Sequence, residues 1–423
     1  MRITLSQIRR FTLVLLFIFI SGYTGYSLGT KQYFSKVSKN SSKNATAIVN
    51  KEAPLNKTNI DFSLFWNVWD KLESNYLYRK DLDSKKMVYG AISGMVASLG
   101  DPYTVFLPPT ENNATKEDLR GDFEGVGIQI GYNKDQKITV VAPLSQSPAE
   151  KARIKSGDVI VKIIDEKNNV NKDAIGLSLP EAVSLIRGKK GTKVTLVIQR
   201  ESEKETRTFI LSRETIVVKS AEVTFQNKNN KKVAILKLSR FGDRTEAEWK
   251  DAVDAIIKEE QKNKSFSGII FDLRNNPGGY LQGAVYIGSE FLQSGVVVQQ
   301  DRGSDGKEQY NINRQGRLLK EPLVVLINGG SASASEIVSG FLKENKRATV
   351  VGEKSFGKGT IQEAEDVGNG AGLHITIARW LLPSGKSIDK EGIMPDIEVK
   401  INPDEKDQTK DLQLDKALEI LTK

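Results

Sequence analysis

The feature that most constrains this sequence is an apolar strand that leads directly into a turn of small residues. Residues 323–327 are all Leu, Val or Ile, and the segment after them is Asn328-Gly-Gly-Ser-Ala-Ser-Ala-Ser-Glu-Ile337. This pattern predicts a strand, a Gly-Gly turn and a helix over residues 335–344. Such a unit places a serine hydroxyl at the positive end of a helix, beside backbone N–H groups that can hold an oxyanion. A simpler interpretation also fits, because Ser333-Ala-Ser-Glu336 is a capping box that can begin a structural helix.

The amino-acid types that the chain lacks narrow its chemistry. It has no cysteine, which excludes a thiol nucleophile and a cysteine-ligated metal, and it has a single histidine, His374. His374 lies in an alternating segment, residues 373–380, that is typical of a half-buried strand, where a histidine is more often packed than catalytic. A serine hydrolase would then need a lysine as its base. Lys358 lies in a glycine-rich loop, and burial can lower the pKa of such a lysine towards neutrality.

Two segments together resemble the signature of the carboxy-terminal processing proteases, the tail-specific serine peptidases. They are Ser-Ala-Ser-Ala-Ser-Glu-Ile (331–337) and Val-Gly-Glu-Lys-Ser-Phe-Gly-Lys-Gly-Thr-Ile-Gln (351–362). The resemblance implies that Ser333 is the nucleophile, that Lys358 is its base and that Gln362 orients the lysine.

Residues 214–403 alternate strand and helix patterns, which predicts an α/β core. The resemblance implies a protease core of the crotonase-like or Clp-protease-like superhelical type. The turn Asp272-Leu-Arg-Asn-Asn-Pro-Gly-Gly279 ends a predicted strand, and its glycines allow close backbone approach. In the family this glycine pair lends one oxyanion N–H, for which Gly279 is preferred over Gly278, and Ala334 lends the other. No metal or other cofactor is expected.

Residues 116–213 resemble a PDZ domain of the circularly permuted kind found in bacterial proteases. Gly125, Val126, Gly127 and Ile128 lie where a glycine-containing loop meets a strand, and such a loop can bind a terminal carboxylate through its N–H groups. The strand can accept a peptide by β-augmentation. Polypeptides with free, apolar C-termini are therefore the expected substrates, and a PDZ fold without a peptide role is the alternative.

Two arginines of this segment have a specific interest. Arg187 closes a predicted helix and is a candidate sensor between the PDZ domain and the protease core, although a helix C-terminus favours a cation in any case. Arg153 lies in Ala-Glu-Lys-Ala-Arg-Ile-Lys-Ser-Gly-Asp (149–158), where the family commonly has glycine. The local turn is therefore expected to depart from the family pattern.

The N-terminal segments predict how the chain is located. Residues 1–10 are a basic end, and residues 11–30 contain no charged side chain and are long enough to span a bilayer. Arginines before the span place the N-terminus inside. We therefore expect a transmembrane signal anchor with a single pass through a bacterial cell membrane, with the catalytic body outside the cytoplasm. A cleaved signal peptide is the competing interpretation. Residues 31–59 predict a flexible linker.

The remaining segments and the net charge bear on assembly and on possible binding partners. Residues 60–115 carry apolar helix faces and resemble the family's N-terminal helical region, which can serve in dimer contacts, so a homodimer is one implication. Residues 404–423 predict a C-terminal tail helix. The formal net charge is +9, but basic and acidic residues are interspersed, and nucleic-acid binding is not expected.

Two other functions compete with a protease. Residues 352–358 nearly match a phosphate-binding loop, but Gly359 occupies the place of the magnesium-binding hydroxyl and no helix is predicted after it, so we reject this interpretation. The second is a catalytically silent PDZ scaffold at the membrane, against which the joint presence of Ser333, Lys358 and Gln362 argues. We therefore predict a serine endopeptidase with a Ser-Lys dyad that recognises and cleaves C-terminal tails of extracytoplasmic proteins.

Overall fold

The computed structural model describes residues 61–133, 135–144, 146–200, 203–400 and 410–423. The predicted basic end, anchor and linker, residues 1–59, lie outside the described residues. The chain divides into two compact units, Met1–Val88 and Tyr89–Lys423. No helix in the described ranges is both long and apolar enough to cross a bilayer.

The described part of the first unit is helical, which confirms the predicted N-terminal helical region. It contains α2 (Ser63–Asn75), the short helix η2 (Arg79–Asp81) and the start of α3 (Ser84–Ala97). The apolar face of α2 is covered only in part, since Trp69 is buried whereas the side chain of Leu64 is 75% exposed.

The second unit is built around a six-stranded sheet in the order β10-β11-β12-β15-β16-β19. β10 pairs antiparallel with β11, and all the other pairs are parallel. This arrangement confirms the predicted α/β core. The strands are β10 (Ala221–Lys228), β11 (Lys231–Leu238), β12 (Phe266–Asp272), β15 (Leu323–Ile327), β16 (Thr349–Gly352) and β19 (Ile397–Glu398).

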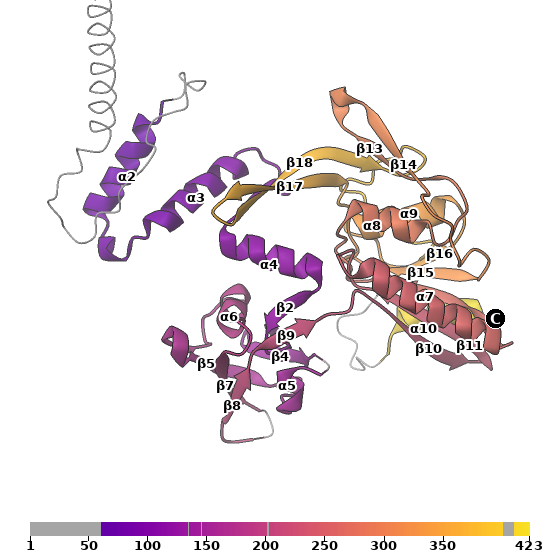
Figure 1. Ribbon diagram of the computed structural model, residues 1–423, viewed down its shortest axis with the longest axis horizontal. Coiled ribbons are helices and arrows are strands. Elements are labelled where there is room, and N and C mark those ends of the chain that lie inside the picture. Colours follow the sequence, from indigo (N-terminus) through magenta and orange to yellow (C-terminus); the bar gives the residue numbers. More distant parts are fainter. Residues whose placement is uncertain (1–60, 134, 145, 201–202, 401–409) are drawn as a thin grey trace, which may run out of the picture. The chain divides into compact units, whose positions relative to one another are not determined.

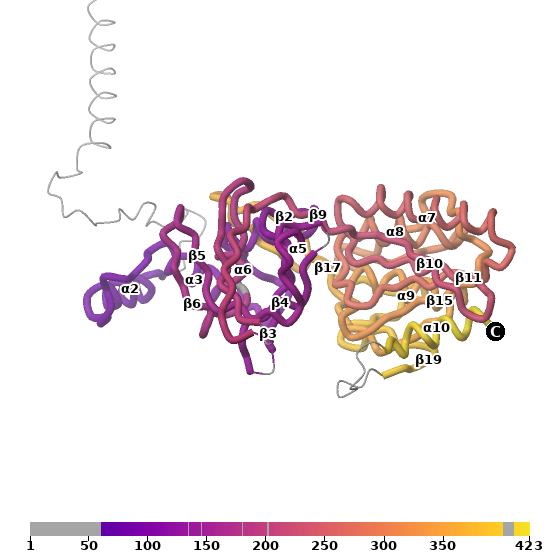
Figure 2. The backbone as a smooth tube through the Cα atoms, turned by 90° about the horizontal axis from the view of Figure 1, so that it is seen from below, coloured from indigo at the N-terminus to yellow at the C-terminus, as the bar shows by residue number. Residues whose placement is uncertain are grey.

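Helices cover both faces of this sheet. Along β12, Phe271 packs into the larger core cluster with three helices, whereas its neighbour Ile270 faces the cluster formed with a fourth helix. Figures 1 and 2 show the sheet between these two layers. Strands covered on both faces are apolar at every position, which explains the continuous apolar run of β15. The helices are α7 (Thr245–Lys262), α8 (Leu281–Gly288) and α9 (Ala334–Glu344) on one face, and α10 (Leu412–Thr422) on the other.

A second sheet lies beside the core and supplies further residues of the site. Its order is β1-β18-β13-β14, and β17 also pairs with β18. His374 lies on β18, opposite Val105 on one side and Ala364 on the other, so the predicted alternating strand is present. The strands are β1 (Val105–Leu107), β13 (Val296–Asp301), β14 (Lys307–Asn311), β17 (Thr360–Gly368) and β18 (Ala371–Leu381).

The segment predicted to resemble a PDZ domain forms a small sheet in the order β3-β4-β5-β7-β8, with β6 paired to β5. An antiparallel ribbon of β2 with β9 connects it to the rest of the unit (Figure 1). Its elements are β2 (Asp122–Gly125), β3 (Ile128–Tyr132), β4 (Ile138–Pro143), α5 (Pro148–Lys151), β5 (Val159–Asp165), η3 (Glu166–Asn168), β6 (Val170–Asp173), α6 (Leu179–Ile186), β7 (Lys193–Gln199), β8 (Arg207–Ser212) and β9 (Glu214–Val217).

One helix of the second unit extends beyond the predicted helical region, residues 60–115. It is α4 (Pro109–Arg120), which begins with a proline and ends at Gly121 in the left-handed conformation, φ 75°. A proline suits the first helical position because the N–H that it lacks would have no partner there. A glycine suits the left-handed end of a helix because it has no Cβ.

The departure noted at Arg153 has a structural counterpart, because this residue has a φ of 63°. A left-handed conformation costs a residue with a Cβ about 1–2 kcal/mol, and a glycine at this position would avoid that cost. Glycine is also freer in the unfolded chain, which offsets about 0.5–1 kcal/mol of this stabilisation. Arg153→Gly is therefore expected to raise the free energy of unfolding by about 0.5–1 kcal/mol, measured by urea unfolding. Lys155→Gly, an exposed neighbour without positive φ, should lower it. Equal losses in both variants would contradict the argument.

Candidate active site

The three serines of the small-residue patch have different surroundings. The hydroxyls of Ser331 and Ser335 are fully buried and donate to the carbonyl oxygens of Leu273 and Asn276, each at 2.9 Å. Ser333 is partly exposed and lines a cleft of about 440 Å³. The outer serines therefore hold the patch in place, and the middle one is accessible to a substrate.

The backbone at Ser333 is strained, with φ 55° and ψ −117°. Conformations of this kind cost roughly 1–3 kcal/mol and persist only where the surrounding structure enforces them. Here the N–H groups of Glu336 and Ile337 both donate to the Ser333 carbonyl oxygen, at 2.8 and 2.9 Å. Gly278 lies so close that a Cβ on it would be 2.8 Å from the Cβ of Ser333. The strain therefore marks this serine as a functional candidate.

Two backbone N–H groups that line the cleft with Ser333 belong to Gly279 and Ala334. Within the described part of the chain, neither has a hydrogen-bond acceptor. The N–H of Gly278, in contrast, donates to Oδ1 of Asn276 at 2.9 Å. Free N–H groups beside a nucleophile are what an oxyanion requires. The hydrogen bonding thus favours Gly279 over Gly278 as the donor from this loop.

Lys358 lines the same cleft as Ser333, so the structure brings the two predicted side chains together. Burial lowers the pKa of Lys358, while the nearby charges of Asp101 and Glu336 act in the opposite direction. The loop is fixed at this point because the indole Nε1 of Trp380 donates to the Lys358 carbonyl oxygen at 2.8 Å. The resulting environment is the one that makes a lysine usable as a base.

Gln362 also lines the cleft, but its amide is engaged elsewhere. Its Nε2 donates to the hydroxyl oxygens of Thr360 and Thr376, at 2.9 and 3.0 Å. The hydrogen bond to Lys358 that the resemblance implies is not formed between these described side chains. Gln362 is instead hydrogen-bonded to β18 through Thr376.

A carboxylate that was expected only to cap a helix connects the loop of Ser333 with the loop of Lys358. Glu336 is buried, and its Oε2 accepts the N–H groups of Ser333 and Lys358 at 2.8 and 3.0 Å. Its Oε1 accepts the Ser355 hydroxyl at 2.5 Å and the Gly357 N–H at 2.7 Å. Burial raises the pKa of Glu336, although these four hydrogen bonds oppose the change. The Ser-x-x-Glu motif was the sequence signal for this residue, but its bonds to the lysine loop had no local signature.

The turn after β12 is held by an ion-pair cluster. Arg274 donates to both carboxylate oxygens of Asp272, at 2.9 and 2.7 Å, and to Asp411 at 2.8 Å. Asp411 also accepts the Leu414 N–H at the start of α10. Asp272 and Arg274 therefore brace the loop that carries the glycine pair, as anticipated from the sequence.

The single histidine lines the cleft as well. Burial lowers the pKa of His374, and the positive charge of Lys358 adds to this effect. The imidazole is therefore neutral at physiological pH. Its place in the cleft was not expected, because the alternation of its strand indicated only a packed or surface position.

The β2–β3 segment forms one wall of a groove whose other wall is α6. The N–H groups of Val126 and Gly127 face no acceptor among the described residues. Gly125 lies outside this wall, since it ends β2 and pairs with Glu214 of β9. The groove is lined by Phe123, Val126, Gly127, Ile128, Gln129, Ile130, Val183, Ile186 and Arg187.

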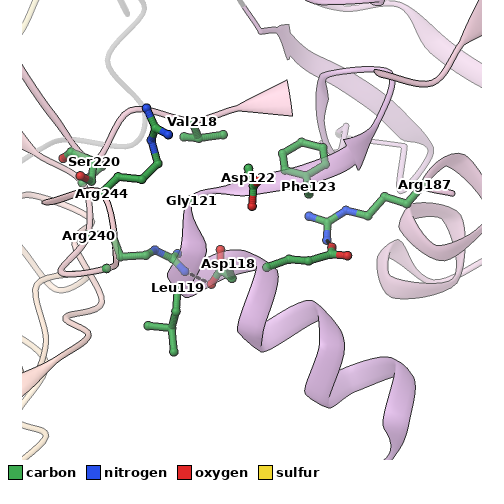
Figure 3. A pocket seen from close by; sticks show the side chains of 13 residues that line it. Asp118, Leu119, Gly121, Asp122, Phe123, Arg187, Val218, Ser220, Arg240 and Arg244 are labelled. Atoms are coloured by element: carbon green, nitrogen blue, oxygen red, sulfur yellow. Dashed lines mark hydrogen bonds and ion pairs between the residues drawn. The ribbon is translucent and has the colours of Figure 1, made fainter. Parts of the chain in front are cut away.

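A further hollow, drawn in Figure 3, shares lining residues with both the groove and the cleft. Arg187 lines this hollow and the groove, ion-pairs with Glu117 at 3.2 Å, and stacks 4.3 Å from the ring centroid of Phe123. Arg240 and Asp118 line this hollow and the cleft that contains Ser333, and they form an ion pair with each other. Charged side chains of α4 thus contact both the small domain and the core.

Comparison with known proteins shows that this arrangement is that of a serine peptidase carrying a PDZ domain. Residues 232–399 match the profile of peptidase family S41, and residues 116–199 match the PDZ domain. Residues 20–110 match the N-terminal domain of the activating protease CtpB.

Individual relatives narrow the class further. The carboxy-terminal processing protease CtpA of Bacillus subtilis is 35% identical over 333 residues, which are 79% of this chain and 68% of that protein. A probable CtpA-like serine protease of Staphylococcus epidermidis is 36% identical over 353 residues, covering 83% and 67%. The solved structure of a photosystem II D1 C-terminal processing protease is 29% identical, with a TM-score of 0.50 over 85% of this chain and 91% of that one. The chain therefore belongs to the carboxy-terminal processing proteases of peptidase family S41, which are serine proteases.

Proposed function

We propose that Ser333 and Lys358 form the catalytic dyad of this protease. The neutral amine of Lys358 takes the proton of the Ser333 hydroxyl as its oxygen attacks the scissile carbonyl, and then returns that proton to the leaving amine. The N–H groups of Gly279 and Ala334 stabilise the oxyanion. The observation that carries this proposal is a strained, accessible serine beside two N–H groups without acceptors, in one cleft with a half-buried lysine.

In the same proposal Gln362 acts on the lysine through its surroundings. Its side chain shares the cleft, and its bonds to Thr360 and Thr376 fix the strand that follows the lysine loop. A small movement of this amide on substrate binding would bring it to the Lys358 amine, since catalytic hydrogen bonds often tighten only in the complex.

The groove of the PDZ domain is proposed to bind the C-terminus of the substrate. The free N–H groups of Val126 and Gly127 suit a terminal carboxylate, and the strand from Ile128 can pair with an extended peptide. Apolar side chains such as Ile130 and Val183 favour an apolar tail. Arg187 is proposed to sense occupancy, because it lines the groove and also pairs with Glu117 of α4.

The location and assembly of the protease are proposed from its N-terminal part. A single-pass anchor over residues 11–30 in a bacterial cell membrane would hold the catalytic body outside the cytoplasm, as the uncharged stretch after a basic end suggests. The exposed apolar side chains of α2, such as Leu64 and Val68, support contact with a second copy. Membrane fractionation and sedimentation of the full-length protein test these two points.

The proposed function is tested with the full-length protein in mild detergent. One unstructured peptide with apolar C-terminal residues is supplied in two forms, with a free C-terminus and as the C-terminal amide. We expect cleavage of both by the wild-type protein, with a higher kcat/KM for the free form, because only that form offers a carboxylate to the loop. Equal rates would contradict tail recognition, and cleavage by Ser333→Ala would contradict the dyad.

A further inference from the structure

The amine of Lys358 faces an aromatic ring, and neither the family signature nor the proposed dyad gives this ring a role. Tyr103 lies in the turn between α3 and β1, and its ring centroid is 5.1 Å from Nζ of Lys358. At this distance the negative face of a ring attracts a cation. Because the contact is electrostatic, it acts on the protonated form of the lysine and hardly at all on the neutral form.

This ring is the direct contact of the ammonium. Among the residues that the structure describes, Nζ of Lys358 has neither a hydrogen bond nor an ion pair. The two acidic groups whose charges act on it are engaged with other donors. Glu336 accepts four hydrogen bonds from the two loops. Asp101 accepts the Tyr103 N–H at 3.0 Å and the Thr104 hydroxyl at 2.6 Å.

The turn that carries Tyr103 is tied to the site. Burial would raise the pKa of Asp101, but hydrogen bonds from Thr104, Thr376 and the backbone outweigh it and lower the pKa, so the carboxylate is ionised. The Thr104 hydroxyl oxygen also accepts the N–H of Thr376 at 3.0 Å, and the Thr376 hydroxyl oxygen accepts Nε2 of Gln362. The ring is thus held on the same network as Gln362.

We propose that Tyr103 is a positioning residue for the catalytic lysine, whose ring face holds the ammonium form of Lys358 and so sets the pH above which the base becomes available. This inference rests on the proposed dyad. When the lysine loses its proton, the attraction to the ring is lost and the amine can turn to the Ser333 hydroxyl. The neutral amine, which is the form of Lys358 that can act as a base, is therefore also the form that the ring does not hold.

The sign of the effect follows from the groups that face the amine. Burial lowers the pKa of Lys358. The charge of Lys358 acts on His374 of β18, so a protonated His374 would in turn lower the pKa of Lys358 further. The ring of Tyr103 and the carboxylates of Asp101 and Glu336 favour the ammonium and raise the pKa. Weakening the ring face should then lower the pKa of Lys358, and the acid limb of the pH profile of kcat/KM, which reports groups of the free enzyme, should move to lower pH.

The experiment keeps the shape of the ring and changes only its charge distribution. Tyr103→Phe in the full-length protein should leave the profile unchanged, because the described residues offer the Tyr103 hydroxyl no hydrogen-bond partner. Replacing that phenylalanine by its increasingly fluorinated analogues weakens the negative face at nearly constant volume. The acid limb should then move down stepwise by about 0.5–1 pH unit in total. A limb that does not move along the series would overturn the proposal.

Two further variants separate this inference from the dyad and from folding. Tyr103→Leu removes the ring face and should move the acid limb of kcat/KM to lower pH, whereas Tyr103→Phe keeps the limb in place, and thermal unfolding shows that both variants remain folded. If Lys358→Ala retains activity, the dyad itself is wrong. If Lys358 is essential and the fluorinated series leaves the limb in place, only the role of Tyr103 is wrong. A change at Glu336 would not explain a stepwise movement of the acid limb along the fluorinated series, because the carboxylate oxygens of Glu336 bond to the two loops and not to the ring.

Discussion

Alanine at Ser333 is expected to lower kcat by roughly 10⁴- to 10⁶-fold, and alanine at Lys358 should lower it nearly as far. The reason is that the hydroxyl oxygen becomes a nucleophile only as its proton leaves, so either residue alone cannot perform the step. For the same reason the double variant should be no slower than the worse of the two single variants. Initial rates on a quenched fluorescent peptide measure this, with thermal unfolding as a check on the fold.

The single histidine offers a matched control for the identity of the base. His374 lines the same cleft, and its imidazole is neutral at physiological pH. His374→Gln should nevertheless keep kcat close to the wild-type value at neutral pH, because in the proposed dyad Lys358 carries the proton. If His374→Gln lowers kcat as much as Lys358→Ala does, the histidine and not the lysine is the base.

Replacing Glu336 by glutamine is expected to lower kcat by about 100-fold, although this side chain touches no substrate. The carboxylate accepts four hydrogen bonds, whereas a glutamine amide has one acceptor oxygen and an NH₂ group that would face two donors. The donors left without acceptors are buried, so the free energy of unfolding should also fall by about 2–4 kcal/mol. Steady-state kinetics and urea unfolding measure the two losses.

The control for this variant lies on the same helix. Glu344 is the exposed last residue of α9, and it accepts hydrogen bonds from the N–H and the hydroxyl of Ser384 rather than from the lysine loop. Glu344→Gln makes the same chemical change there and should leave kcat unaltered. If Glu336→Gln keeps full activity, the carboxylate does not place the two loops.

The sequence revealed those parts of the site that are local in the chain. The run from Leu323 to the start of α9 carries its own strand, turn and helix signals, so a serine at the start of a helix could be predicted from the pattern, and the family signature selected Ser333. Lys358 followed from the absence of cysteine and the position of His374, together with the family signature. The parallel sheet could also be predicted from the sequence, because strands buried on both faces are almost continuously apolar.

Contacts between distant segments could not be derived in this way. Tyr103 reaches Lys358 only because β1 pairs with β18, and no sequence spacing announces that pairing. The Glu336 motif correctly indicated a cap, but three of its four donors, Ser355, Gly357 and Lys358, belong to the lysine loop. The second half of helix α4 lay beyond the predicted helical region, because the helix is polar along most of its length and lacks the apolar repeat by which a helix is recognised.

The shared carboxylate of Glu336 couples the two halves of the proposed dyad. One side chain accepts the N–H groups of both Ser333 and Lys358, so a displacement of either loop breaks bonds to the other. States in which only the serine or only the lysine is in place are therefore costly. We therefore expect the two loops of the proposed site to become ordered together, so that the nucleophile is in place only when its base is.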